Sequence, residues 1–203
     1  ALSADIWYRV VVKSGVCDAM NSNAIKITVN QPPSITSHPV NQSKCEGSSA
    51  TFSVSFNGGS PAPSIQWQVN TGSGFVNISD GGVYSGATTG TLSITGVLPS
   101  MNNYTYRAVL QSGVCSIVTS NAATLNVSAA TNAGTLSGAK TVCSGSNSGA
   151  LTLSGYTGSI VRWESSSTGG APWSAIASTS STYTSGALSS DVWYRAVVKS
   201  GVC

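Results

Sequence analysis

Charged residues are scarce in this sequence. Asp, Glu, Lys and Arg make up 7% of its 203 residues, against about a quarter in an average globular protein. The surface must therefore consist largely of Ser, Thr, Asn and Gly, which suits a secreted β-protein better than a cytosolic helical one. The net charge of +3 is scattered along the chain. Without a basic stripe to neutralise phosphates, we expect no nucleic-acid partner.

Long apolar runs are also absent, although 40% of the residues are hydrophobic and can fill small cores. No run approaches the roughly 20 residues that a membrane-spanning helix needs. The N-terminus lacks the charged and apolar regions of a signal peptide. We therefore expect no membrane insertion in this segment, with any export signal or anchor lying outside it.

Residues suited to catalysis or metal binding are few. The chain has one histidine, His38, six acidic residues and no G-x-S-x-G motif. His38 precedes a proline and is interpreted as a surface residue. The acidic residues are dispersed, and the cysteines lack the spacing of metal ligands. The sequence therefore predicts no enzyme, no catalytic residue, no cofactor and no metal site.

What the sequence does contain is an internal repeat. Residues 1–17 and 187–203 are identical at 14 of 17 positions, and a third copy lies at 102–115. Each copy has Tyr-Arg followed by a cysteine eight residues after the Arg. The same closing strand follows the first two copies, as SNAIKITV and SNAATLNV. We therefore predict three domains: the C-terminal part of one repeat (1–30), a complete repeat (31–128) and a repeat lacking its last strand (129–203).

The complete repeat has the pattern of short strands. Ala50, Phe52 and Val54 alternate with polar residues, as in a strand with one buried face. Residues 65–69 repeat the alternation around Trp67, and turn residues such as 57–59 separate the runs. No segment has a convincing helical period. The predicted fold class is all-β.

A set of ordered motifs narrows this fold. The motifs in chain order are Glu46-Gly47, the run from Ala50, Pro61-x-Pro63-x-Ile65-x-Trp67 and Tyr104-x-Tyr106. They resemble intermediate-type immunoglobulin domains, which implies tandem immunoglobulin-like Greek-key β-sandwich domains. The two positions where that family places its inter-sheet disulfide are Val54 and Tyr106 here, so packing against Trp67 must replace the bond. Trp163 and Tyr194 are the corresponding core residues of the last repeat.

Two cysteine motifs carry a second resemblance. Cys-x-Gly stands before strand B at Cys45 and Cys143, and Gly-Val-Cys ends each copy of the repeat. The combination is similar to the repeats of very large surface adhesins of gliding bacteria. This resemblance implies an extracellular filament at the cell surface, in which neighbouring repeats are partners and the function is attachment or motility. A carbohydrate-binding module array of an exported enzyme and an Ig-type cell-surface receptor are the alternatives.

The five cysteines suggest disulfides. Pairing within repeats would join Cys45 to Cys115 and Cys143 to Cys203. In the assumed sandwich, however, Cys45 lies about 30 Å toward the C-terminal pole, while Cys115 lies at the opposite pole. A head-to-tail array would instead favour a Cys45–Cys203 bridge between repeats, with Cys17, Cys115 and Cys143 pairing outside this segment. Bridges within repeats and free thiols remain the alternatives.

Two pairs of residues are candidates for surface contact. Trp7 and Arg9 alternate with apolar residues in the first copy of the repeat, as do Trp193 and Arg195 in the last. If the apolar residues face the core, each pair lies on the outer face of its strand. An exposed aromatic beside a cation suits contacts with glycans or other surface proteins. The simpler interpretation is that each Trp packs on its neighbours, and the middle copy has Thr105 at this position.

Overall fold

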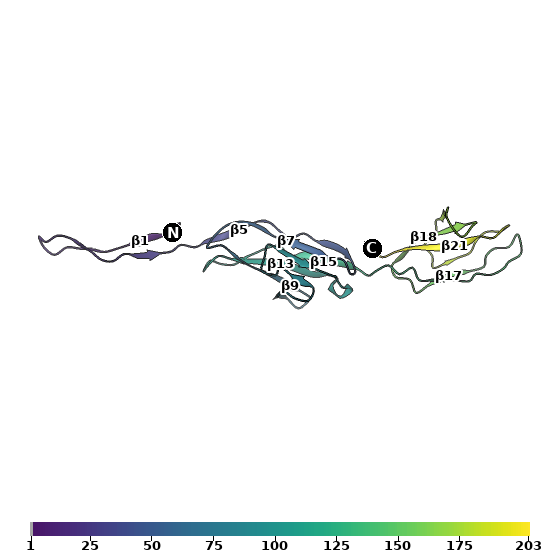
Figure 1. The fold of residues 1–203 in the computed structure, drawn as a ribbon, viewed down its shortest axis with the longest axis horizontal. Coiled ribbons are helices and arrows are strands. Elements are labelled where there is room, and N and C mark those ends of the chain that lie inside the picture. Colours follow the sequence, from purple (N-terminus) through teal and green to yellow (C-terminus); the bar gives the residue numbers. More distant parts are fainter. Residues whose placement is uncertain (1) are drawn as a thin grey trace. The chain divides into compact units, whose positions relative to one another are not determined.

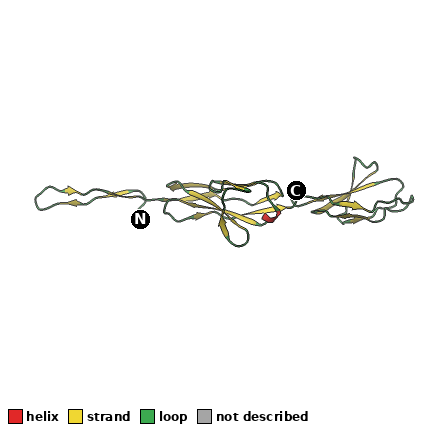
Figure 2. Ribbon diagram, turned by 60° about the horizontal axis from the view of Figure 1, so that its bottom comes forward, coloured by secondary structure: helices red, strands yellow, loops and turns green. Residues whose placement is uncertain are grey.

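The computed structural model describes residues 2–203, and the secondary structure of this part of the chain is almost entirely β. Figure 1 shows the order of the strands along the chain. Figure 2 shows strands joined by turns and loops, and the helical element is a single 3-10 turn, η1 (Pro99–Met101). The predicted all-β class is confirmed.

The strands are short, as expected where turn residues recur every few positions. In chain order they are β1 Ile6–Tyr8, β2 Val11–Val12, β3 Met20–Asn21, β4 Ile25–Ile27, β5 Gln31–Ser37, β6 Gln42–Cys45, β7 Ala50–Ser53, β8 Ser55–Ser60, β9 Ser64–Asn70, β10 Phe75–Asn77, β11 Tyr84–Ser85, β12 Thr91–Ile94, β13 Tyr104–Gln111, β14 Val118–Thr119, β15 Ala123–Ser128, β16 Thr135–Ser137, β17 Leu151–Ser154, β18 Ser159–Ser166, β19 Ser174–Ile176, β20 Thr182–Tyr183 and β21 Trp193–Lys199.

The chain folds as two compact units, each assembled from segments distant in sequence. The first unit comprises Ala1–Val40, Thr51–Ser93 and Thr105–Thr124. The second comprises Asn41–Ala50, Ile94–Tyr104 and Leu125–Cys203. Residues of the predicted complete repeat contribute to both units.

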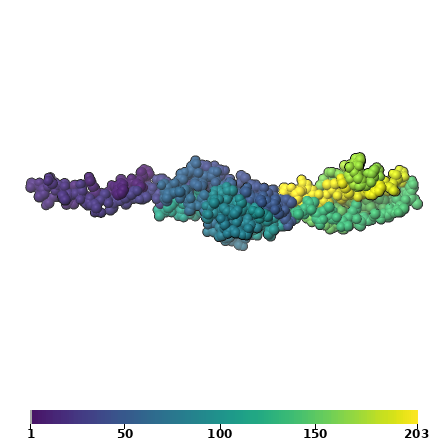
Figure 3. All heavy atoms as spheres, viewed as in Figure 1, coloured from purple at the N-terminus to yellow at the C-terminus, as the bar shows by residue number. Residues whose placement is uncertain are grey.

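The first unit begins with a two-stranded ladder. β1 pairs with β4, placing Trp7 opposite Lys26, and β2 pairs with β3, placing Val11 opposite Asn21. The large apolar side chains of this ladder are exposed: Trp7, Tyr8, Val10, Val11, Val12, Met20, Ile25 and Ile27. Figure 3 shows the segment, in purple, as a narrow band of atoms. The ladder thus forms backbone pairs without a core of its own.

The first unit also contains an aromatic core. Trp67 and Tyr106 are fully buried, and the ring of Phe52 stacks on that of Tyr106 with centroids 4.8 Å apart. The indole Nε1 of Trp67 donates a hydrogen bond of 2.8 Å to the carbonyl of Thr89. Val54 is buried as well. Aromatic and aliphatic packing therefore occupies the positions where a sandwich of this type would hold an inter-sheet disulfide.

The strands of residues 31–128 form three sheets. The largest has the order β10-β9-β13-β15-β6, with β14 paired to β13, and the other two are β11-β12-β7 and β5-β8. β15 and β6 run parallel, while the neighbouring pairs β9–β10 and β9–β13 are antiparallel. Two local expectations differ from this structure. Val54 lies between β7 and β8 instead of within one strand, and the predicted linker 30–33 enters β5, where an edge strand tolerates its prolines.

The C-terminal part of the second unit has two three-stranded sheets, β16-β17-β20 and β19-β18-β21. β18 and β21, drawn in green and yellow in Figure 1, pair from Ser159↔Lys199 to Ser166↔Trp193. Trp163 is fully buried, and its indole Nε1 donates to the carbonyl of Ser180 at 2.9 Å. Leu151, Leu153 and Ile160 complete this buried cluster, against which Tyr194 packs while remaining only partly buried. The core of this region is thus built around the same residue type as that of the first unit.

Candidate functional site

The junction around Cys45 is the first candidate site, and it lies entirely within the second unit. β15 and β6 run side by side until Ser128 faces Cys45. The next amide, that of Glu46, donates to the carbonyl of Ser128 at 2.8 Å. The carboxylate of Glu46 accepts a hydrogen bond from the amide of Ala130 at 3.0 Å. The segment that follows β15 is therefore fastened to the turn that follows β6.

Cys203 reaches this junction from the other end of the unit. It forms a disulfide with Cys45 across a sequence separation of 158 residues, with the two Cα atoms 5.1 Å apart. Nearby, the amide of Val202 donates to Ser128 Oγ at 3.3 Å, and the amide of Ser200 donates to Thr131 Oγ1 at 3.1 Å. The junction thus combines one covalent bond with several hydrogen bonds to residues 128–131.

The other three cysteines are free thiols in this structure. Cys17 and Cys143 are exposed, and Cys115 is partly exposed. Pairing within repeats, the alternative for Cys115 and Cys143, is therefore not what the structure contains. The partners predicted for these three cysteines outside the segment remain a prediction.

A glycine sits beside the junction residue in two copies of the repeat. Gly201 has a φ of +47°, and a Cβ there would collide with the side chain of Ser128. Gly113, with a φ of +51°, faces the side chain of Asn30 in the same way. Asn30 and Ser128 each follow the closing strand of their copy by the same number of residues. The same close approach is thus built twice, once in each unit.

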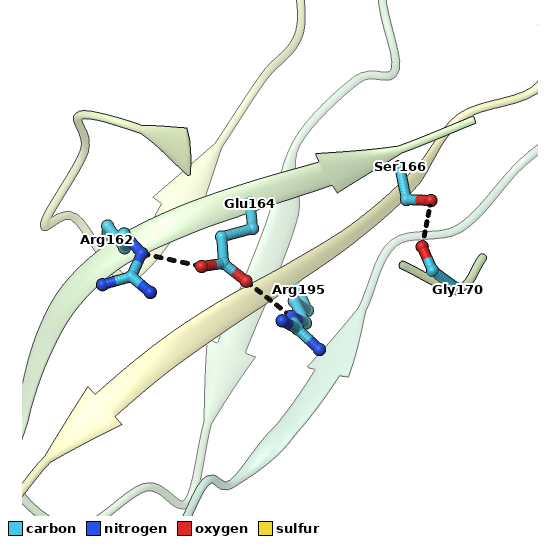
Figure 4. Close-up of polar contacts among 5 residues, drawn as sticks. All are labelled: Arg162, Glu164, Ser166, Gly170 and Arg195. Carbon is cyan, nitrogen blue, oxygen red and sulfur yellow. Dashed lines mark hydrogen bonds and ion pairs between the residues drawn. The ribbon is translucent and has the colours of Figure 1, made fainter. Parts of the chain in front are cut away.

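An arginine cluster on the sheet β19-β18-β21 is the second candidate site. Glu164, which is only 5% exposed, accepts hydrogen bonds from Arg162 Nε at 2.7 Å and from Arg195 Nε at 2.6 Å (Figure 4). The hydrogen bonds from Arg195 and Arg162 hold the pKa of the Glu164 carboxyl below its usual value. Because each arginine uses only its Nε here, the remaining guanidinium donors are available to a ligand.

An aromatic ring supports this cluster. The guanidinium carbon of Arg195 lies 4.1 Å from the ring centroid of Trp173, within range for a cation–π interaction. The loop that carries Trp173 is closed by Ser166, whose hydroxyl donates to the carbonyl of Gly170 at 2.6 Å (Figure 4). The predicted surface residue Arg195 therefore has Trp173 as its aromatic partner. That residue had been interpreted only as part of a strand, and it lies just before β19.

The first unit contains a simpler version of the cluster. Arg107 Nε donates to Gln68 Oε1 at 2.9 Å, and its guanidinium carbon lies 3.9 Å from the ring centroid of Phe75. Gln66 stands at the position of Arg162, and its amide nitrogen donates to the carbonyls of Trp67 and Ile78. The arginine on an aromatic ring is therefore common to both repeats, while the second arginine and the carboxylate are particular to the last.

The remaining predicted surface residues are all exposed. Trp7 is 64% exposed, with Lys26 Nζ 5.8 Å from its ring centroid, and Arg9 is exposed beside it. Trp193 is 46% exposed, and Gly169 lies against its ring. The sequence analysis missed Glu164 and the role of Trp173. The alternation of Arg162 and Glu164 around the core Trp163 was the available signal.

The described residues offer little for catalysis. His38 Nδ1 accepts a hydrogen bond from the amide of Asn121 at 3.0 Å, so this imidazole is engaged in a structural contact. No group of three or more His, Cys, Asp or Glu residues within 2–203 is placed to hold a metal ion. No helix in the same range is long and apolar enough to cross a membrane.

Two family models match the chain. Residues 32–110 match the model of an immunoglobulin domain. The chain contains an Ig-like domain. Residues 132–203 match the model of a domain of unknown function, DUF8696. A search of curated proteins finds no match.

Solved structures similar to this chain include extracellular and muscle Ig domains. Extracellular domains 3–5 of Drosophila OTK are 18% identical, with a TM-score of 0.46 over 61% of this chain and 40% of that one. The Ig1-2 module of the Drosophila receptor protein tyrosine phosphatase DLAR is 24% identical, with a TM-score of 0.42 over 66% and 71%. The complex of titin M10 with obscurin-like 1 Ig gives 19%, 0.42, 50% and 98%. At these values we attribute to the neighbours nothing beyond the fold.

Proposed function

We propose that this chain is a segment of an extracellular array of Ig-like repeats whose role is structural and adhesive. In this proposal residues 31–128 form a complete repeat, while residues 1–30 and 129–203 belong to its neighbours. The internal repeat and the immunoglobulin match at 32–110 support this division. The observation that carries the proposal is the Cys45–Cys203 disulfide, because its two cysteines belong to consecutive predicted repeats.

The proposed role follows from where the covalent bond is placed. Disulfides of small secreted domains usually strengthen the interior of one domain. Here the predicted repeats have aromatic cores without bridges, and the bond instead joins residues on either side of a predicted boundary. An array built in this way gains fixed joints, which suits a protein that holds its neighbours in order.

In its most specific form, the proposal is a surface adhesin of the type found in gliding bacteria, acting in attachment or motility. This form rests on the Cys-x-Gly and Gly-Val-Cys motifs of the repeat. Partners would be neighbouring repeats of the same chain, together with glycans or other surface proteins. Extracellular export agrees with the sparse charge and with the disulfide.

The structural role is tested by small-angle scattering of the chain and of the double variant Cys45→Ser, Cys203→Ser. We expect the double variant to populate a wider range of interdomain arrangements, because the linker after Ser128 keeps only its hydrogen bonds. Cys143→Ser, which removes a free exposed thiol, is the matched control and should scatter as the parent does. Indistinguishable scattering of the parent and the double variant would overturn the structural proposal.

A carbohydrate-binding module array is a second candidate, and the arginine cluster is the observation that favours it. Arg195 on the Trp173 ring and the exposed Trp193 present aromatic and cationic groups on one sheet. Glycan-array binding by the chain, abolished in Trp193→Ala or Trp173→Ala, would support this candidate. Retention of chain-coated beads on bare and protein-coated surfaces, with no glycan binding, would support the adhesive array.

A further inference from the structure

The strand β21 is the edge of its sheet in the described part of the chain. It pairs with β18 on one side and is the last strand in the order β19-β18-β21. The equivalent strand β13, in the middle copy of the repeat, has β9 on one side and β14 and β15 on the other. An edge strand presents a row of unpaired backbone N–H and C=O groups, which can accept a further strand.

The segment that pairs with this edge is defined by the other two copies. In the middle copy, the amide of Ser120 donates to the carbonyl of Ala108 at 2.8 Å, and Ser120 Oγ accepts from the amide of Ala108 at 2.9 Å. In the first copy, Ser22 makes the same two bonds with Val10, both at 2.9 Å. Ala196 is the corresponding residue of β21. The copies therefore specify both the partner and its contact with the strand.

The register of this pairing is also the same in the two copies. Val11 faces Asn21 in the first copy, and Val109 faces Thr119 in the middle copy. Asn21 and Thr119 both immediately precede the serine of the closing strand. By this correspondence, Val197 of β21 would face Asn21 of the closing strand.

Burial of the inward-facing side chains shows that β21 has room for a partner. In β13 the three inward residues are fully buried: Tyr106, Ala108 and Leu110. Their counterparts in β21 are only partly buried: Tyr194, Ala196 and Val198. Beside Tyr194 lies an open, mainly apolar hollow lined by residues that include Leu136, Leu151 and Val192. The surface next to this edge thus exposes apolar atoms that a further strand would cover.

The closing strand of the first copy has the complementary deficit. Ile25 and Ile27 are 57% and 40% exposed. Their counterparts in the middle copy, Ala123 and Leu125, are fully buried. Moving these two isoleucines from water into a core would be favourable, because the hydrophobic effect scales with the apolar area removed from water.

We propose that β21 accepts the closing strand of a second copy of this chain, residues 22–29, in the register that places Val197 opposite Asn21. The sequences around β1 and β21 are nearly identical, so the closing strand finds the same backbone and side-chain positions on either one. β1 is paired only with β4 in the described residues and has no core behind it. β21 is supported by β18 and by the cluster around Trp163. Exchange from β1 to β21 therefore keeps the hydrogen bonds and adds burial.

The experiment is a cross-link between two full-length chains that differ in their cysteines. Both carry Cys17→Ser, Cys115→Ser and Cys143→Ser, which leaves the Cys45–Cys203 disulfide intact. One also carries Asn21→Cys, and the other carries Val197→Cys at the partly exposed position of β21. After mixing and mild oxidation, we expect a heterodimer joined at these two residues, identified by mass spectrometry of the linked peptides.

The matched control replaces Val197→Cys by Val198→Cys. Neighbouring residues of a strand point to opposite faces, so a cysteine at Val198 cannot meet the one at Asn21 in the proposed register. We expect the Val197 pair to cross-link about tenfold faster, which corresponds to about 1.4 kcal/mol of preference. Equal rates for the two pairs, or no heterodimer at any concentration tested, would overturn the proposal.

A synthetic peptide of residues 18–30 provides a second measurement on the unmodified chain. We expect it to suppress the heterodimer by occupying β21, whereas the same peptide with Ile25→Asp and Ile27→Asp should have no effect. Suppression by both peptides alike, or by neither, would contradict the pairing that we propose.

Discussion

The middle and last copies of the repeat share an anchor but differ in the face of one strand. Trp67 and Trp163 are both fully buried, and each donates its indole N–H to a backbone carbonyl at 2.8 and 2.9 Å. Tyr106 is fully buried while its counterpart Tyr194 is only partly covered. The tryptophan thus depends on strands that both copies contain. Burial of the tyrosine accompanies the closing strand, which only the middle copy pairs with.

The two copies also differ in how they hold an arginine on a ring. The middle copy holds Arg107 with the neutral amide of Gln68, and the last copy holds Arg195 with the carboxylate of Glu164. A carboxylate can bind a second arginine as well, and Arg162 is the one that it binds. The position is therefore tolerant of chemistry, provided that the group accepts a hydrogen bond from the arginine.

Truncating the two tyrosines should separate the copies most strongly. Tyr106→Ala removes a fully buried ring that stacks on Phe52 and should cost about 3–5 kcal/mol, the range for large aromatic residues in cores. Tyr194→Ala should cost clearly less, because its ring is already partly in water. Urea unfolding followed by tryptophan fluorescence measures both. Equal losses would mean that the partial burial of Tyr194 has no energetic consequence.

Removing the disulfide should have the next largest effect. The double variant Cys45→Ser, Cys203→Ser should lose about 2–4 kcal/mol of stability, because the bridge restricts a long loop in the unfolded chain. Differential scanning calorimetry of oxidised protein measures this as a lower midpoint. Cys143→Ser should leave the midpoint unchanged. A shift confined to one of two resolved transitions would show which part of the chain the bridge supports.

Substituting the glycine beside the junction should have a moderate effect. Gly201→Ala should cost about 1–2 kcal/mol from its left-handed backbone alone, and more from the collision with Ser128. Gly47→Ala is the matched control, because its φ is +80° and its Cβ would meet open space. Thermal unfolding of the two variants isolates the contact. If both lose the same stability, the close approach at Ser128 contributes nothing.

Changing Glu164 to the amide found in the middle copy should have the smallest effect, visible as a pH dependence. The folded pKa of Glu164 is depressed, so its contribution is present above the unfolded value of 4.5 and is lost as pH falls through the folded pKa. Glu164→Gln should therefore flatten the loss of stability in acid that begins near pH 4.5. Gln68→Glu should introduce such a loss in the middle copy. Unfolding curves at several pH values, unchanged by either substitution, would contradict this account.

Much of this fold could be predicted because short-range patterns determine it. Alternation around Trp67 and turn residues between runs are local features, and they indicate strands directly. The self-similarity of the chain then extends the same interpretation to Trp163. Local patterns do not fix where one strand ends and the next begins, which is why Val54 lies between two strands and the prolines after Asn30 lie within one.

The contacts of the arginine cluster were harder to predict. Arg162 and Glu164 alternate on one strand, so a shared face could have been inferred from the sequence alone. The approach of Trp173 to Arg195 depends on the path of a loop closed by Ser166 and on the pairing of β18 with β21. Such a contact is set by tertiary geometry, and residue spacing gives no direct sign of it.

The Cys45–Cys203 bond also determines how this chain would carry a mechanical load. A pull applied between Gln31 and Cys203 runs along the backbone to Cys45 and then crosses the disulfide. The residues between the two cysteines lie on a covalent detour and bear no tension while the bond is intact. Reduction would release this hidden length, on the order of 500 Å of extended chain. The redox state of a single bond would then decide whether the chain is short and stiff or long and yielding.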